Sequence, residues 1–191
     1  LLAAKAGLII PDTHLFAGKK HRYFGIKRFD RDGDKPRHMH SLCGLIHADH
    51  QTPSLDYQSV LNVTYQLSKN MQEVEKAFRL ACFNLLAHNR DDHSKNFSYV
   101  LNTHNEWQLA PAYDLTFSYG PAGEHSTTFM GEGKAPNKEH LFELAKQAGI
   151  HHDSAQSIFQ TVDNAVQSWP MVAKECGVMA KTIRSIGQII L

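Results

Sequence analysis

The sequence predicts an α+β fold that is mostly helical and carries two small β-hairpins. Apolar residues recur at helical spacing over residues 71–88, and the C-terminal third of the chain shows the same periodicity. Aromatic and aliphatic residues flank two turn signals, as in hairpins. With 191 residues, of which 42% are hydrophobic and 20% charged, the chain suffices for one medium-sized domain with its own core.

The first expected elements are the end of a helix and a hairpin. Residues 1–7 have the pattern of a helix end, with Gly7 in a C-terminal capping position. The chain opens inside this amphipathic pattern and without a Met, so we expect further residues upstream. Aromatic residues around the turn at 17–18 predict a β-hairpin over residues 13–29. A polar turn is expected at residues 31–37.

Two short helices and one long helix are expected next. Residues 38–48 and 59–67 predict the short ones. The strongest helical pattern in the chain runs over residues 71–88. Glu73 and Glu75 lie in its first turn, where negative charge is favourable to the helix dipole.

The second hairpin and the last helices complete the predicted fold. Residues 97–101 and 107–109 predict strands joined by the turn NTHNE. Gly and Pro indicate a loop over residues 120–136. Three more helices are expected, at residues 137–148, 152–169 and 178–191.

Composition excludes several classes of protein. The formal net charge is +1, with 20 basic and 19 acidic residues, so nothing in it favours direct binding to nucleic acid. No apolar run reaches the roughly 18 residues that a membrane-spanning helix needs. Cys43, Cys82 and Cys176 are odd in number and far apart. We therefore expect reduced thiols in a cytoplasmic protein.

A cluster of polar residues, NRDDHSKN at positions 89–96, lies between the long helix and the second hairpin. We call it the polar loop. A polar loop held by rigid elements on both sides is a common place for catalytic groups. Arg90 directly precedes Asp91, and Asp91 and Asn96 are separated by four residues, as in the protein-kinase loop H-R-D-x-x-x-x-N. In that loop the Asp accepts a proton from the substrate hydroxyl and the Asn holds Mg²⁺.

A second carboxylate follows the second hairpin. Protein kinases need such a group to hold the metal ions that bridge the phosphates of ATP. Here Asp114 stands in the sequence PAYDL, directly after the hairpin. Oxygen ligands from Asn96 and Asp114 suit Mg²⁺, which keeps several waters and binds few protein groups.

With both motifs in view, NRDDHSKNFS followed by LAPAYDLTFS, the sequence resembles the HipA-like serine/threonine protein kinases, which are the toxins of bacterial toxin–antitoxin pairs. The earlier KRFDR and RHMHSLCGL add to the resemblance, which covers nearly the whole chain. It implies that residues 1–191 form the C-terminal lobe of a kinase-like fold, and that an N-terminal lobe lies upstream.

The resemblance also implies roles for individual residues. The expected base is Asp91. The expected metal ligands are Asn96 and Asp114. The residues expected to contact ATP are His93, Lys95 and Asn96 near its phosphates, Tyr113 beside the nucleotide and Phe29 against adenine. The implied cofactors are ATP and Mg²⁺. The implied partners are a protein substrate, such as an aminoacyl-tRNA synthetase, and a DNA-binding antitoxin of the HipB type.

Two features of kinases are absent from the sequence, and two alternatives stay open. The chain has no Gly-rich phosphate loop and no lysine in a V-A-I-K context, which in this family lie upstream. Leu115 follows Asp114 where D-F-G has Phe, and the Gly is also absent, as is usual in the family. One alternative is a metal-dependent phosphohydrolase that uses Asp91, Asp92, His93 and Asp114. The other is a pseudokinase lobe that only docks the antitoxin. Phe29 and Tyr113 could also be packing residues alone.

Overall fold

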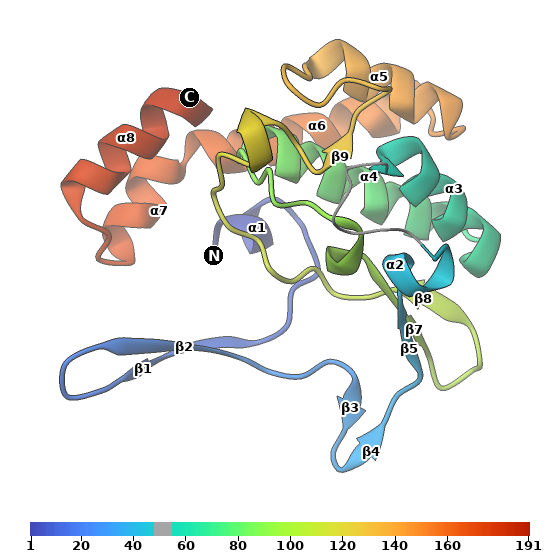
Figure 1. Cartoon of the computed structure of the whole chain (residues 1–191), viewed down its shortest axis with the longest axis horizontal. Coiled ribbons are helices and arrows are strands. Elements are labelled where there is room, and N and C mark those ends of the chain that lie inside the picture. Colours follow the sequence, from blue (N-terminus) through green and yellow to red (C-terminus); the bar gives the residue numbers. More distant parts are fainter. Residues whose placement is uncertain (48–54) are drawn as a thin grey trace.

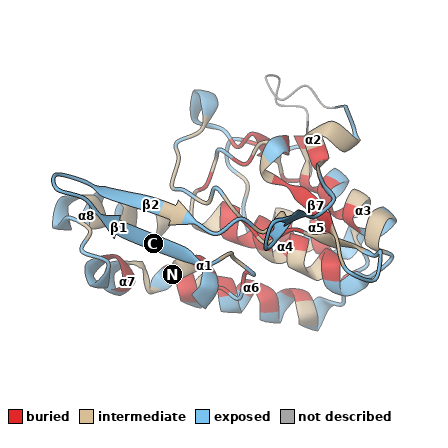
Figure 2. Cartoon of the chain, turned by 90° about the horizontal axis from the view of Figure 1, so that it is seen from below, coloured by how far each residue is buried: buried red, intermediate tan, exposed pale blue. Residues whose placement is uncertain are grey.

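The computed structural model describes residues 1–47 and 55–191, and one long helix lies at its centre. This helix, α4 (Met71–Leu86), packs against α3 (Tyr57–Ser68) on one side and α6 (His152–Gln167) on the other (Figure 1). Asn70 caps it, with its side chain accepting a hydrogen bond from the backbone of Gln72. Apolar residues at helical spacing bury most of its surface, as Figure 2 shows, so the predicted helix at 71–88 is confirmed.

The other helices surround α4 or extend the chain beyond it. α5 contacts α3, α4 and α6, and the short α1 lies against α6. α7 and α8 pair with each other next to one end of the helical body, near both chain termini (Figure 1). Their bounds are α1 (Leu2–Lys5), α2 (Leu42–Leu45), α5 (Lys138–Gln147), α7 (Trp169–Glu175) and α8 (Ala180–Ile190). The predicted helix at 152–169 ends earlier than expected, because the chain turns at Ser168 and α7 begins there.

The second predicted hairpin is confirmed and gains a third strand. β7 (Ser98–Leu101) pairs with β8 (Trp107–Leu109) on one side and with β5 (Met39–Ser41) on the other, all antiparallel. The helix predicted at 38–48 is therefore wrong over its first residues, which pair with β7. Only the four residues of α2 are helical, and residue 48 lies outside the described part of the chain. A short apolar run does not distinguish a strand from a helix.

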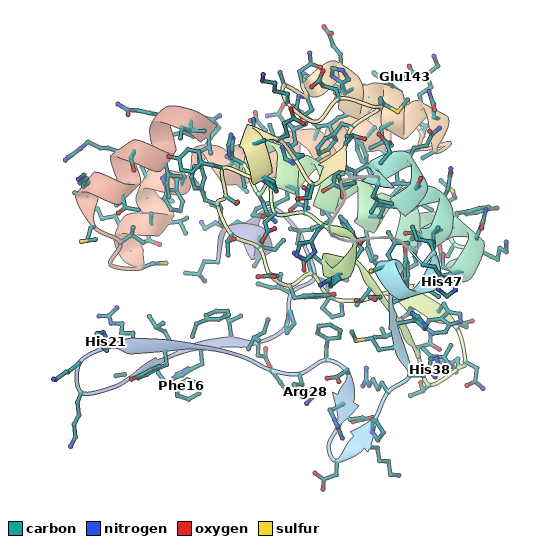
Figure 3. The ribbon with its side chains drawn as sticks, viewed as in Figure 1. Phe16, His21, Arg28, His38, His47 and Glu143 are labelled. Atoms are coloured by element: carbon teal, nitrogen blue, oxygen red, sulfur yellow. The ribbon has the colours of Figure 1, made fainter. Side chains whose placement is uncertain are left out.

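The first predicted hairpin is confirmed and projects from the body of the molecule. β1 (Thr13–Ala17) and β2 (Arg22–Ile26) are antiparallel, with Phe16 opposite Tyr23. Figure 1 shows the hairpin extending from the chain on the same side as α7 and α8, below them in this view, and Figure 3 places Phe16 on it and His21 at its far end. The expected turn at 31–37 forms a smaller hairpin of two-residue strands, β3 (Arg31–Asp32) and β4 (Lys35–Pro36).

A short parallel pair of strands connects the residues just before α3 to the segment after residue 120. β6 (Leu55–Asp56) precedes α3 directly and pairs with β9 (Thr127–Thr128). The rest of residues 120–136 is largely irregular, as predicted, with one 3₁₀ turn at Pro121–Gly123. Phe129 is nevertheless fully buried, so this segment packs into the core. Within the described ranges, the structure contains no helix long and apolar enough to cross a membrane.

Candidate functional site

The polar loop begins at a sharp turn after α4. His88 adopts a positive φ of 54°, and the next residue, Asn89, is buried. The backbone N–H of Asn89 donates to the carbonyl of Asn84 at 2.9 Å, and its side-chain amide donates to the Asn84 side chain at 3.0 Å. Asn89 also forms a β-bridge with Ser118. These contacts fix the start of the loop to the last turns of α4, which is a rigid base for the residues that follow.

Three of the residues predicted for the site lie together on this loop. The carboxylate of Asp91 is half-exposed, and its Oδ1 lies 3.9 Å from Nε2 of His93. The side-chain amide of Asn96 donates to the backbone carbonyl of Asp91 at 2.9 Å. The 3₁₀ turn at Ser94–Asn96 brings Asn96 back toward Asp91. A solvent-accessible carboxylate, an imidazole and an amide are thus held within one short loop.

Tyr113 joins the polar loop to the second hairpin. Its hydroxyl donates to the carbonyl of Lys95 at 2.6 Å and lies 2.6 Å from Oγ of Ser98. Because the single phenolic proton goes to Lys95, Ser98 is the donor in the second bond. Burial raises the pKa of Tyr113, so the phenol keeps its proton. The ring of Phe29 lies 5.5 Å from the Tyr113 ring, so these two predicted nucleotide contacts form one aromatic pair. The side chain of Lys95 is exposed to solvent.

Asp114 lies at the wall of a hollow between the projecting hairpin and the helical body. The hollow has a volume of about 440 Å³, and apolar side chains including Ile10, Phe24 and Ile26 line it together with Tyr113 and Asp114. The backbone of Asp114 has a positive φ of 54°, which is uncommon for a residue with a side chain. Such strained positions concentrate at functional sites. A single exposed carboxylate thus borders a mainly apolar cavity.

The donor set fits the predicted Mg²⁺. The Asn96 amide gives its N–H to Asp91, which leaves its oxygen without a hydrogen bond from any described residue. Asp114 offers a carboxylate, and both are the hard oxygen ligands that Mg²⁺ prefers. No hydrogen bond joins Asn96 to Asp114 within the described part of the chain, and no group of three or more His, Cys, Asp or Glu there could hold a metal ion. Two protein oxygens suit a cation whose other ligands are water and phosphate.

Asp92, which the sequence places only in the phosphohydrolase alternative, is the centre of a buried hydrogen-bond network. Its side chain is buried, and each carboxylate oxygen accepts two hydrogen bonds. Oδ2 accepts from the Tyr57 hydroxyl and from Nδ1 of His125, both at 2.9 Å. Oδ1 accepts from the backbone N–H groups of Ser126 at 2.9 Å and Thr127 at 3.2 Å. Four donors around two oxygens is the arrangement that an ionised carboxylate, which can only accept, requires.

The Asp92 network continues into the helical core. Asn84 of α4 donates its side-chain amide to the Tyr57 hydroxyl at 2.8 Å. Burial raises the pKa of Tyr57 well above its usual value, and the neighbouring charge of Asp92 adds to the effect. The phenol therefore stays protonated and donates to Asp92. The only sequence signal for this network is the doubled Asp in NRDDH, because its partners come from distant segments and have no characteristic spacing.

Comparison with known proteins shows the family to which the chain belongs. The sequence model of the HipA-like C-terminal domain matches residues 1–169. The chain belongs to the HipA-like C-terminal domain family. A Haemophilus influenzae (strain ATCC 51907 / DSM 11121 / KW20 / Rd) protein described as a "Putative kinase" is 31% identical across an alignment that covers 57% of this chain and 36% of that protein.

A solved structure shares the fold over nearly the whole chain. It is HipA of the Shewanella oneidensis MR-1 toxin–antitoxin system, in complex with HipB and operator DNA. The TM-score is 0.74, with 16% sequence identity, over 97% of this chain and 50% of that one. The predicted α+β, HipA-like fold is thereby confirmed. The chain spans about half the length of that HipA and about a third of the Haemophilus protein.

Proposed function

We propose that this chain is the catalytic C-terminal part of a HipA-like serine/threonine protein kinase, which transfers the γ-phosphate of ATP to a hydroxyl of a protein. The observation that carries the proposal is the arrangement of Asp91, His93 and Asn96 on one anchored loop, with Asp114 at the wall of an apolar hollow. Membership of the HipA-like family and the relative described as a kinase support it.

Asp91 acts as the general base in this proposal. Its carboxylate is accessible, whereas the neighbouring Asp92 is buried and its oxygens are fully occupied. A base must reach the proton that it accepts, and only Asp91 of the two can do so. The carboxylate would take the proton of a Ser or Thr hydroxyl as that oxygen attacks the γ-phosphorus in line with the leaving oxygen.

The remaining predicted residues bind and orient ATP. Asn96 and Asp114 would hold Mg²⁺, which when bound neutralises charge on the phosphates. His93 and Lys95 lie on the same loop and supply polar contacts to phosphate. The pair of Phe29 and Tyr113 would lie beside the adenine, since their rings are adjacent and half-buried.

The partners follow from the family and from the structural relative. A HipB-type antitoxin is the proposed partner, since that HipA is in complex with HipB and operator DNA. A protein substrate such as an aminoacyl-tRNA synthetase, and a cytoplasmic location, rest on the family resemblance. The balanced charge of the chain argues against its own binding to nucleic acid.

The burial of Asp92 argues against the phosphohydrolase alternative, and the presence of the kinase-type residues argues against a pseudokinase. The hydrolase needs Asp92 at the reacting atoms, and Asp92 is buried with its lone pairs occupied. A pseudokinase has no chemical need for Asp91, Asn96 and Asp114 together, and all three are present.

Calorimetry with Mg²⁺ and ATP tests this proposal. In the full-length protein, Asp114→Asn should weaken Mg²⁺-dependent ATP binding by about ten-fold or more, because a metal ligand loses its charge. Asp92→Asn should weaken it less, since Asp92 does not face the hollow. Circular dichroism checks that both variants are folded. If the parent protein does not bind ATP, the hydrolase is favoured; if Asp92→Asn is the more damaging change, the assignment within the loop is wrong.

A further inference from the structure

The segment from Gly123 to Lys134, which we call segment 123–134, is bound to the polar loop by the side chain of Arg90. The guanidinium of Arg90 donates to the backbone carbonyl of Gly123, at one end of the segment. It also donates to the carbonyl of Lys134, at the other end, at 3.1 Å. One residue beside Asp91 therefore holds both ends of a segment that follows Asp114 in the chain.

Segment 123–134 makes return contacts to the loop on both sides of Asp91. The hydroxyl of Ser126 donates to the carbonyl of Arg90 at 3.1 Å, and the Ser126 N–H donates to the same carbonyl at 3.2 Å. The hydroxyl of Thr127 donates to the carbonyl of Asp92. The carbonyl of Asp91 itself is bound by Asn96. The backbone carbonyls of Arg90, Asp91 and Asp92 are thus all hydrogen-bonded. Those of Arg90 and Asp92 accept from the hydroxyls of Ser126 and Thr127.

The segment is itself firmly held in the core. His125 and the N–H groups of Ser126 and Thr127 bind the buried carboxylate of Asp92. Phe129 is fully buried, with its ring 4.3 Å from that of Tyr57 and 5.1 Å from that of His125. Because the segment is packed into the core, its hydrogen bonds can restrain the backbone conformation of the polar loop.

The Asp91 carboxylate, in contrast, has little to orient it directly. About half of its side chain is exposed, and its only ionic neighbour among the described residues is His93 at 3.9 Å. Its direction is therefore set by the backbone on which it stands. In-line phosphoryl transfer depends mainly on positioning, and a displacement of about 1 Å can cost about a hundred-fold in rate.

We propose that segment 123–134 positions the catalytic base, with Ser126 and Thr127 as positioning residues that hold the backbone on either side of Asp91. This inference rests on the proposed function of Asp91. It adds that kinase activity depends on two hydroxyls that touch neither ATP nor the substrate.

The test compares two threonines of the same strand in the full-length protein. Thr127→Val and the double variant Ser126→Ala/Thr127→Val remove the hydroxyls that bind the polar loop. Thr128→Val is the matched control, because Thr128 donates to Asp56 at 2.6 Å and makes no hydrogen bond to the loop.

We expect kcat to fall by about ten-fold or more in the double variant, with the KM for ATP changed by less than about two-fold. Thr127→Ser should keep kcat near that of the parent, since it restores the hydroxyl. An unchanged kcat in the double variant, or an equal fall in Thr128→Val, would overturn the inference.

Hydrogen exchange separates this inference from the proposed function. In the double variant, the backbone amides of residues 89–96 should exchange faster than in the parent, and in Thr128→Val they should not. If the double variant fails to fold, Thr127→Val alone is measured, since Val is isosteric with Thr and the N–H bond to Asp92 remains. Equal exchange in variant and parent contradicts the coupling, whether or not the parent transfers phosphate. A parent protein that shows no transfer, with exchange as expected, contradicts only the proposed function.

Discussion

At the scale of single residues, Asp91 and Asp92 are neighbours in opposite environments. Asp91 faces solvent, whereas Asp92 is buried and accepts four hydrogen bonds. The sequence indicates Asp91 because its distance from Asn96 is a local spacing that chemistry requires. It does not indicate the role of Asp92, because Tyr57 and His125 lie more than thirty residues away on either side.

Replacement of Asp92 should cost stability rather than nucleotide affinity. Asp92→Ala leaves His125, the Tyr57 hydroxyl and the Thr127 N–H buried without their acceptor, and the Ser126 N–H keeps only its bond to the Arg90 carbonyl. We expect a loss of about 3–5 kcal/mol in the free energy of unfolding, measured by urea denaturation of the full-length protein. Asp92→Asn should lose less, since its amide oxygen still accepts from the backbone. The exposed Asp34→Ala is the control, with a change within about 0.5 kcal/mol. A loss in Asp92→Ala no larger than that of the control would contradict the network.

At the scale of elements, the hairpin of β1 and β2 is recognisable in the sequence, but its surroundings are not. Its strand pattern is local, so the sequence predicts it. The described part of the chain leaves its aromatic residues uncovered: Phe16, Tyr23 and Phe24 are 55%, 60% and 70% exposed. The sequence predicts a helix at the short strand β5 for a related reason: β5 is a strand because it pairs with β7, some sixty residues away.

The exposed hairpin should make these 191 residues associate when they are expressed alone. A two-stranded hairpin is marginally stable by itself, and its apolar side chains and unpaired edges favour contact with another chain. Sedimentation velocity over a concentration series should show oligomers, and Phe24→Ser should reduce them. Tyr65→Ser is the control, since Tyr65 is 46% exposed and lies on α3. A monomer at every concentration would show that the hairpin surface does not drive self-association.

At the scale of the whole molecule, the site divides into a part that is contiguous in sequence and a part that is not. The long helix, the polar loop, the second hairpin and Asp114 follow one another over residues 71–115, so their order and spacing already point to a kinase-type site. The surrounding supports come from β6, α3 and segment 123–134, which only the fold brings together. The sequence therefore predicts which residues act but not which residues hold them in place.

The transfer of radiolabelled γ-phosphate from ATP tests the central claim most directly. The full-length protein should label itself or a protein target in the presence of Mg²⁺, and Asp91→Asn should reduce labelling by about 10²–10⁴-fold, because Asn has a similar shape but cannot take the proton. The 191-residue chain alone should give no labelling, since it has no Gly-rich phosphate loop and no lysine in a V-A-I-K context. Asp153→Asn, an exposed change in the first turn of α6, should label like the parent. Labelling by a folded Asp91→Asn variant within a few-fold of the parent would contradict the account.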